Sequence, residues 1–250
     1  MSAMPKTKLM NFVIAFTIIA SLLLMSANPL IDHEDLPDGD APILSHNPDN
    51  KLTLRNSNDW SATGSAANPA VLRSLDTSPN NEIVVSGVIS GSTTMTLGST
   101  SITSGQYIEP WIAKADANGN WQWIQKVSIT GTSQFAEATV QDISVAPNGD
   151  IFATGMFYDT ISFGGITLTS TGYWDCWTAK LSASGQWQWA QALRGNGDYD
   201  GMTVTTLDVV YGTSITTDSN NNPIIGGWFL GNTDVGVAAD TGAQDGTDIE

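Results

Sequence analysis

Residues 111–123 read WIAKADANGNWQW, and residues 177–189 read WTAKLSASGQWQW. A tryptophan, an Ala-Lys pair, a glycine and a Trp-Gln-Trp triplet coincide in the two stretches at a constant spacing of 66 residues. Neither stretch shows the 3.6-residue period of an amphipathic helix, whereas short β-forming runs around a glycine are typical of antiparallel strands. The chain is therefore predicted to be built from repeated β units.

The match extends upstream and downstream of these stretches. Residues 78–83 (SPNNEI) correspond to residues 146–151 (APNGDI) at a spacing of 68, and Gly87 and Gly155 follow at matching positions. A third copy contains residues 221–227 (NNPIIGG). Turn-forming Pro, Asn, Asp and Gly residues at fixed places between apolar runs predict several short strands in each unit. The strands expected in the second unit are 142–146, 150–156, 161–163, 166–168, 176–181 and 187–190, with turns at 147–149, 164–165 and 184–185.

The second unit resembles a known repeat family. Residues 147–155 (PNGDIFATG) and 175–187 (DCWTAKLSASGQW) are similar to the repeat of bacterial and archaeal "seven-bladed β-propeller" (SBBP-type) proteins. The resemblance covers about residues 59–250 and implies propeller blades of four antiparallel strands. It implies no catalytic or binding residue, because the family's motif concerns the strands themselves.

The expected fold is thus all-β, with antiparallel β-propeller-type repeats of about 60–70 residues. The blades are expected at about 59–123, 124–189 and 190–250, roughly three in number and incomplete. Asp248-Ile249-Glu250 corresponds to Asp175-Cys176-Trp177, so the third blade is expected to be truncated and the chain to be a fragment.

The N-terminal part predicts export. Lys6 and Lys8 precede the uncharged residues 9–31, which suit either the apolar region of a signal peptide or a span of the membrane. Residues 1–27 are therefore expected to be a cleaved signal peptide or a retained membrane-anchor helix, and the protein to be secreted or anchored at the cell surface. Contact with a membrane is expected only through residues 9–31. Residues 28–58, rich in Asp and Pro, are predicted to be a disordered acidic linker.

The charge balance excludes one class of partner. Nine Lys and Arg residues stand against 25 Asp and Glu residues, which gives a formal net charge of −16. So negative a surface repels phosphate backbones, and nucleic-acid binding is not expected. The partner is otherwise unknown, with a glycan and a surface protein as the two kinds considered.

Few residues of the repeats suit common catalytic chemistry. Both histidines, His33 and His46, precede the repeats, and Cys176 is the single cysteine of the chain. A Ser-His-Asp triad, a Cys-His pair or a His-ligated zinc cannot be built from residues 59–250 alone. Cys176 is expected to be a small buried apolar residue. No catalytic, cofactor-binding or metal residue is predicted.

Two features leave alternatives open. Trp121 with Trp123, and Trp187 with Trp189, are expected to share one face of a strand, either buried between blades or stacking on sugars. The polar stretches 116–120 and 218–222 have the residues of hairpin turns, and calcium is the alternative because oxygen ligands recur at alternate positions.

The expected function is a secreted or cell-surface module for binding or structural display, without enzymatic activity. The alternative is a fragment of an exported propeller enzyme, a carbohydrate-active hydrolase or a quinone-dependent dehydrogenase, with its active site outside this chain. A cluster of carboxylate or arginine side chains that departs from the repeat would favour the enzyme, and the sequence shows no such cluster.

Overall fold

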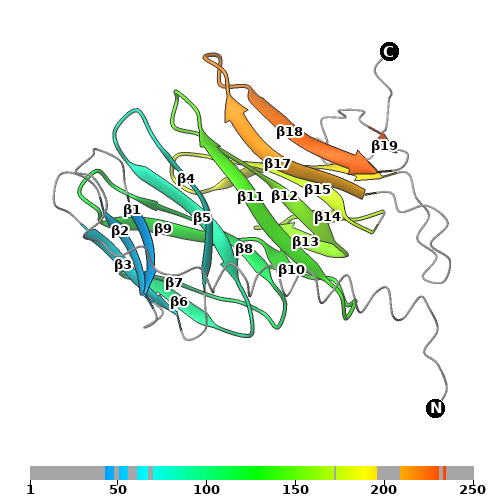
Figure 1. Ribbon diagram of the computed structural model, residues 1–250, viewed down its shortest axis with the longest axis horizontal. Helices are drawn as coiled ribbons and strands as arrows, with labels where there is room; N and C mark the ends of the chain where they lie inside the picture. Colours follow the sequence, from blue (N-terminus) through cyan, green and yellow to red (C-terminus); the bar gives the residue numbers. More distant parts are fainter. Residues whose placement is uncertain are drawn as a thin grey trace. The chain divides into compact units, whose positions relative to one another are not determined.

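The computed structural model describes residues 43–47, 51–55, 61–66, 70–171, 173–195, 209–230 and 233–234. Within these ranges every regular element is a β-strand, and neighbouring strands of each sheet are antiparallel (Figure 1). The predicted all-β, antiparallel class is confirmed. The described strands form five separate open sheets and do not close into a propeller ring.

Three of these sheets contain the long strands. The first sheet has the order β4 (Val71–Thr77), β5 (Ile83–Ile89), β8 (Glu109–Ala115) and β9 (Trp121–Lys126). The second has the order β11 (Glu137–Val145), β12 (Ile151–Tyr158), β15 (Asp175–Leu181), β16 (Trp187–Gly195) and β19 (Thr233–Asp234). The third contains β17 (Val209–Thr217) and β18 (Pro223–Leu230).

Two further sheets, made of shorter strands, contain the hairpins inserted between the second and third strands of the first two sheets. One has the order β1 (Ile43–Asn47), β2 (Lys51–Arg55), β3 (Ser61–Ala66), β6 (Thr94–Leu97) and β7 (Thr100–Thr103). The other has the order β10 (Ser128–Ile129), β13 (Thr160–Phe163) and β14 (Ile166–Thr169). The hairpin predicted around Gly164-Gly165 is confirmed, but it lies outside the sheet that contains its flanking strands, β12 and β15.

Part of the predicted linker, 28–58, is not irregular. Strands β1 and β2 lie inside it and pair from Ile43 with Arg55 to Asn47 with Lys51, so the expectation of disorder is wrong for these residues. Alternation of apolar and polar residues over 51–55 (KLTLR) suits a strand, which the emphasis on acidic and proline residues overlooked. The predicted signal or anchor, 1–27, lies outside the described residues. In the part of the chain that is described, no helix could span a membrane.

The turns at the start of each long sheet share one geometry. Ala146 N donates to Asp150 O and Gly149 N donates to Ala146 O, both at 2.8 Å, and Gly149 has a φ of 87°. A positive φ suits glycine or asparagine, which explains why Asn81 and Asn221 take this place in the other two sheets. The predicted turn at 147–149 is confirmed.

A β-bulge precedes this turn in the first strand of each long sheet, with Arg73, Gln141 and Thr213 as the extra residues. Opposite the second bulge, a Cβ on Gly155 would overlap the carbonyl oxygen of Thr139. A glycine is therefore required where the two backbones approach closely. The equivalent glycines of the first and third sheets are Gly87 and Gly227.

The main core lies between the first and second sheets. Val84 and Ile112 of the first sheet pack with Ile151 and Trp177 of the second, and Phe163 of the β13–β14 hairpin joins them. All five are fully buried. A smaller cluster joins the opposite face of the second sheet to Ile215 of the third. The second sheet thus has neighbours on both faces.

Polar contacts join the first strands of the three long sheets, β4, β11 and β17, which are neighbours (Figure 1). The Asp142 carboxylate accepts hydrogen bonds from Ser74 Oγ at 2.6 Å and from Ile215 N at 2.9 Å, so one side chain of β11 contacts both adjacent sheets. Asp76 of β4 accepts from Val145 N at 2.7 Å. These hydrogen bonds join each long sheet to the next one along the chain.

Candidate functional site

The two tryptophans of each predicted pair lie on opposite faces of their sheet. In the second sheet Trp187 pairs with Leu181, whereas Trp189 pairs with Lys180, and Gln188 is an extra residue between them. Directly opposed residues share a face and successive residues alternate, so the bulge turns the two indoles apart. The expectation that each pair occupies one face is wrong, because the bulge was not visible in the Trp-Gln-Trp pattern. The first sheet repeats this arrangement with Trp121 and Trp123.

All four of these indoles are half-buried. Trp187 makes an edge contact with Phe163, with ring centres 5.0 Å apart, and Trp189 lies 5.9 Å from Phe152. Trp123 reaches from the first sheet to the second, where its Nε1 donates to Ala183 O at 3.3 Å. The prediction of packing between successive sheets is confirmed for Trp123.

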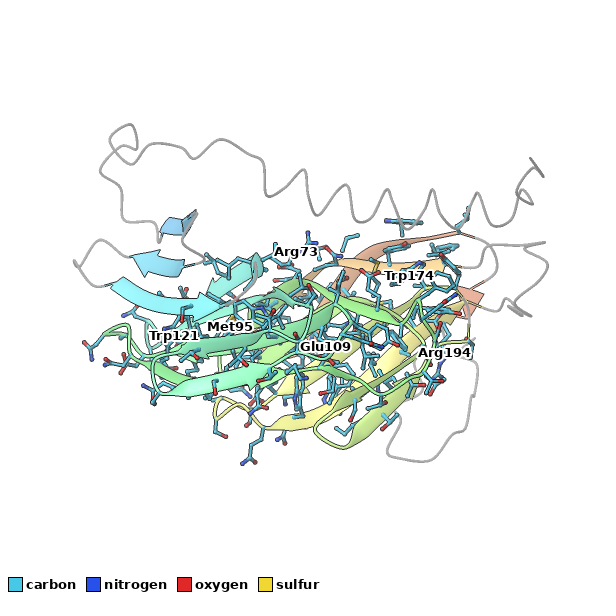
Figure 2. All side chains as sticks on the ribbon, turned by 90° about the horizontal axis from the view of Figure 1, so that it is seen from below. Arg73, Met95, Glu109, Trp121, Trp174 and Arg194 are labelled. Carbon is cyan, nitrogen blue, oxygen red and sulfur yellow. The ribbon has the colours of Figure 1, made fainter. Side chains whose placement is uncertain are left out.

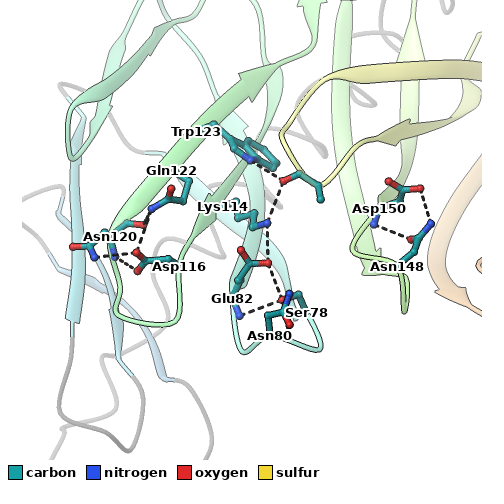
Figure 3. Close-up of polar contacts among 11 residues, drawn as sticks. Ser78, Asn80, Glu82, Lys114, Asp116, Asn120, Gln122, Trp123, Asn148 and Asp150 are labelled. Atoms are coloured by element: carbon teal, nitrogen blue, oxygen red, sulfur yellow. Dashed lines mark hydrogen bonds and ion pairs between the residues drawn. The ribbon is translucent and has the colours of Figure 1, made fainter.

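The two stretches considered for calcium form hydrogen-bonded turns, and Figure 3 shows the first of them. Asp116 Oδ1 accepts from the backbone N of Asn118 and Asn120, and Oδ2 accepts from the side-chain amides of Asn120 and Gln122. The Asn120 side chain contributes most to lowering the pKa of Asp116. Asp218 is held in the same way. These carboxylates stabilise their own turns, and among described residues no three His, Cys, Asp or Glu side chains gather as for a metal ion.

The lysine of the repeated Ala-Lys pair has a structural partner. Lys114 lies 2.8 Å from Glu82 and also donates to Ala183 O at 3.1 Å, so it connects the first sheet to the second (Figure 3). Lys180 lies 2.7 Å from Asp150, the residue at the corresponding turn. The motif that carries the family resemblance therefore serves packing.

Two buried carboxylates were not predicted as a pair. Glu109 accepts from Gly105 N and Ile129 N, both at 2.9 Å, while Asp175 accepts from Thr171 N at 2.8 Å and Gly195 N at 3.1 Å. Glu109 and Asp175 are 66 residues apart, so the repeat spacing could have revealed them. Each of these carboxylates accepts backbone hydrogen bonds at the start of the third strand of its sheet.

Cys176 is buried, as expected, and burial is the main reason that the pKa of its thiol is raised. A Cβ on Gly212 of the third sheet would lie 2.7 Å from Cys176 Sγ, so the thiol fills space between two sheets. A raised pKa keeps the thiol protonated and unreactive near neutral pH.

One cluster departs from the repeat and suits binding. Glu137 begins β11, and burial raises the pKa of its carboxyl to about 7, against the influence of the Arg73 guanidinium nearby. Its Oε1 is enclosed and has no hydrogen-bond partner in the structure. The corresponding residues of the other units differ in kind: Val209 replaces Glu137, and Gln141 and Thr213 replace Arg73. This departure from the repeat was not recognised from the sequence.

Aromatic side chains surround Glu137. Tyr158, its direct partner on β12, contacts Tyr173 and Trp174, with ring centres 5.6 and 6.2 Å away. Tyr211 on β17 has its pKa raised to about 12, mainly by burial and further by Glu137 and Tyr173. In the view of Figure 2, Arg73 and Trp174 both lie toward the upper side of the sheets.

Tyr211 is also stacked on Trp228, with ring centres 4.3 Å apart and planes inclined by 15°, and Trp228 is 52 % exposed. The cluster therefore runs from an enclosed carboxyl to an open aromatic surface. Carboxyl, hydroxyl and indole groups at one place can hydrogen-bond a polar ligand while ring faces pack on its apolar side. These residues come from five strands and from the segment just before β15, so only strand pairing and packing bring them together. The chain matches no protein-family model and no curated protein.

Proposed function

We propose that this chain is an exported β-propeller-type repeat module that binds a polar ligand, most simply a glycan, at the cluster around Glu137. The sheet order supports the propeller interpretation: the first strands β4, β11 and β17 are neighbours, and Asp142 contacts both adjacent sheets. Propeller blades are arranged with their first strands innermost, where ligand sites are commonly found. The resemblance to SBBP-type repeats supports the same interpretation.

The observation that carries the proposed ligand class is the combination of one enclosed acid with an exposed aromatic surface. Glu137 can donate or accept a proton near neutral pH, and Tyr211 and Trp228 present stacked rings beside it. Sugars offer hydroxyl groups to the first and C–H faces to the second. The carboxylates of Asp142, Glu109 and Asp175 instead hold backbone donors, which favours binding over carboxylate catalysis.

A glycan array with the purified chain, followed by calorimetry on any retained sugar, tests this proposal. Glu137→Gln and Trp228→Ala should each weaken binding at least tenfold, while Phe135→Ala should leave it unchanged. Phe135 is a matched control because it is 49 % exposed and outside the cluster. Failure to retain any glycan, or equal retention by Trp228→Ala, would contradict the assignment.

Glu137 also favours a second candidate function. A carboxyl that titrates near pH 7 suits the general acid of a carbohydrate-active hydrolase, which needs a second carboxylate across the substrate. A hydrolase screen distinguishes the two functions, since turnover abolished by Glu137→Gln would assign an enzyme.

Export is tested separately by intact mass: a mature chain starting near Asn28 indicates a cleaved signal, and a full N-terminus indicates an anchor.

A further inference from the structure

In the first and second long sheets, the third strand covers the second strand in the same way. Gly87 of β5 pairs with Trp111 of β8, and Gly155 of β12 pairs with Trp177 of β15. Both indoles are fully buried against the glycine opposite, and Trp177 Nε1 donates to Thr139 O at 3.0 Å. In both sheets, therefore, the edge of the second strand is covered by a third strand that carries a tryptophan opposite the glycine.

The third sheet has the same glycine but no such cover among the described residues. Gly227 of β18 lies opposite Gly212 and against Tyr211 O, as Gly155 lies against Thr139 O. The free side of β18 exposes large apolar residues, and the counterparts of all but the last of them, Leu230, are buried on β5 and β12. These residues are Ile224, Ile225, Trp228, Phe229 and Leu230, which are 36 to 60 % exposed.

A second, independent feature lies on the second sheet. In the first sheet Lys114 and Trp123 both donate to Ala183 O, and the Trp123 ring lies against Gly185, in the turn between β15 and β16. Their counterparts in the second sheet are Lys180 and Trp189. Lys180 pairs with Asp150 and lies over Phe152 in its own sheet, and Trp189 packs on Phe152 in the cluster that also contains Ile215 of the third sheet.

The two features point to one occupant. In the second sheet the strand with Trp177 and the turn with Ala183 and Gly185 belong to a single hairpin, β15–β16, which touches both β12 and the first sheet. An equivalent hairpin beside β18 would place its tryptophan on Gly227 and its turn on Trp189. The site thus continues an interface already present between the first and second sheets.

We propose that β18 together with Lys180 and Trp189 is a docking site for a β-hairpin of a partner polypeptide that carries a tryptophan opposite Gly227. The inference rests on the repeat arrangement proposed above. Residues 231–250 contain no tryptophan. A second copy of the chain is not the occupant, because its own tryptophan-bearing strands, β8 and β15, are interior strands of their sheets with Trp111 and Trp177 fully buried.

The test uses the full chain and a dye-labelled peptide with the sequence of residues 173–192, followed by fluorescence anisotropy. Saturable binding with one peptide per chain is expected. The peptide with Trp177→Ala should bind at least tenfold more weakly, because its indole no longer covers Gly227. The matched peptide with Gln188→Ala should bind unchanged, since Gln188 is exposed and donates only to a neighbouring carbonyl.

Variants of the chain test the other half of the site. Trp189→Ala should weaken binding about tenfold, Trp189→Phe should weaken it less, and Phe135→Ala should have no effect, with circular dichroism confirming that each variant is folded. Absence of saturable binding, or equal binding of the Trp177→Ala peptide, would overturn the proposal. Concentration-dependent dimers that the peptide does not dissociate would overturn it as well, in favour of a second copy on β18.

Hydrogen exchange on the same samples separates this failure from failure of the repeat arrangement. Slow exchange of the Ile215 amide that is lost in Asp142→Ala supports the sheet order whether or not the peptide binds. If Ile215 exchanges fast in the unmodified chain, the sheets are not joined as proposed, and the docking proposal fails with them.

Discussion

The second and third long sheets begin alike and differ in what covers them. Each has the same hydrogen-bonded turn after its first strand, a bulge whose extra residue lies five positions before the first residue of that turn, and a glycine opposite the bulge. β12 nevertheless has all residues buried except the last, whereas β18 has none in that class. Phe157 and Phe229 occupy corresponding positions, with 0 % and 60 % of their surfaces exposed.

The difference shows that burial of a strand is decided by its neighbours. β12 has β11 on one side and β15 on the other, with the first sheet across one face. β18 has only β17 as a described partner. Apolar composition predicts that a strand can be buried, but the burial itself requires strands that come from elsewhere in the chain or from a partner.

The largest expected effect is a difference in stability between variants of Phe157 and of Phe229. Phe157→Ala should lower the free energy of unfolding by about 3–5 kcal/mol, because a fully buried ring leaves a cavity. Phe229→Ala should change it by no more than about 0.5 kcal/mol, as for an exposed side chain. Chemical denaturation of both variants measures the contrast. An equal loss in Phe229→Ala would mean that β18 is covered in solution.

The pH dependence of stability should arise from the second sheet, because Val209 stands in the third where Glu137 stands in the second. The carboxyl of Glu137 has a pKa of about 7 when folded, above its ordinary value of 4.5, so the folded chain binds the proton more tightly. Its contribution to stability is therefore complete below about pH 4.5 and is lost as the pH rises through 7, by about 3 kcal/mol. Denaturation between pH 4 and 8 measures this slope, and Glu137→Gln should flatten it. A slope unchanged in that variant would assign it to another group.

Asp142 should couple the two sheets. Asp142→Ala removes the acceptor for Ser74 Oγ and Ile215 N and should cost about 2 kcal/mol, chiefly by leaving an amide without its partner. Amide exchange at Ile215 should speed up more than exchange in β12. Asp142→Asn, which keeps one carbonyl acceptor, is the matched control and should lose less. Equal exchange rates in all three proteins would show that the third sheet is held by apolar packing alone.

The smallest effect is expected at the exposed turns. Asp116→Ala and Asp218→Ala each remove the carboxylate that accepts the turn's amides, and both should lower the melting temperature slightly and by similar amounts. Similar values would show that these turns are stabilised locally, whatever covers their sheet. A rise in melting temperature on adding calcium, absent in Asp116→Ala, would instead assign the first turn to metal binding.

Local features of this protein follow from the sequence alone. The turn at 147–149 and the hairpin at Gly164-Gly165 occur where proline, asparagine and glycine permit few other conformations. The antiparallel all-β class follows from the same short, regularly placed runs. The isolated position of Cys176 and the absence of histidine after residue 46 limited the chemistry in the same direct way.

Only the tertiary structure decided which distant residues meet. One extra residue, Gln188, places Trp187 and Trp189 on opposite faces, a consequence that the Trp-Gln-Trp pattern does not reveal. Glu137 and Tyr211 approach because β11 and β17 are neighbours in different sheets, and burial then shifts the pKa values of both. The physical reason is that turns and strand periodicity depend on the adjacent backbone, whereas register, burial and the electrostatic surroundings depend on partners many residues away.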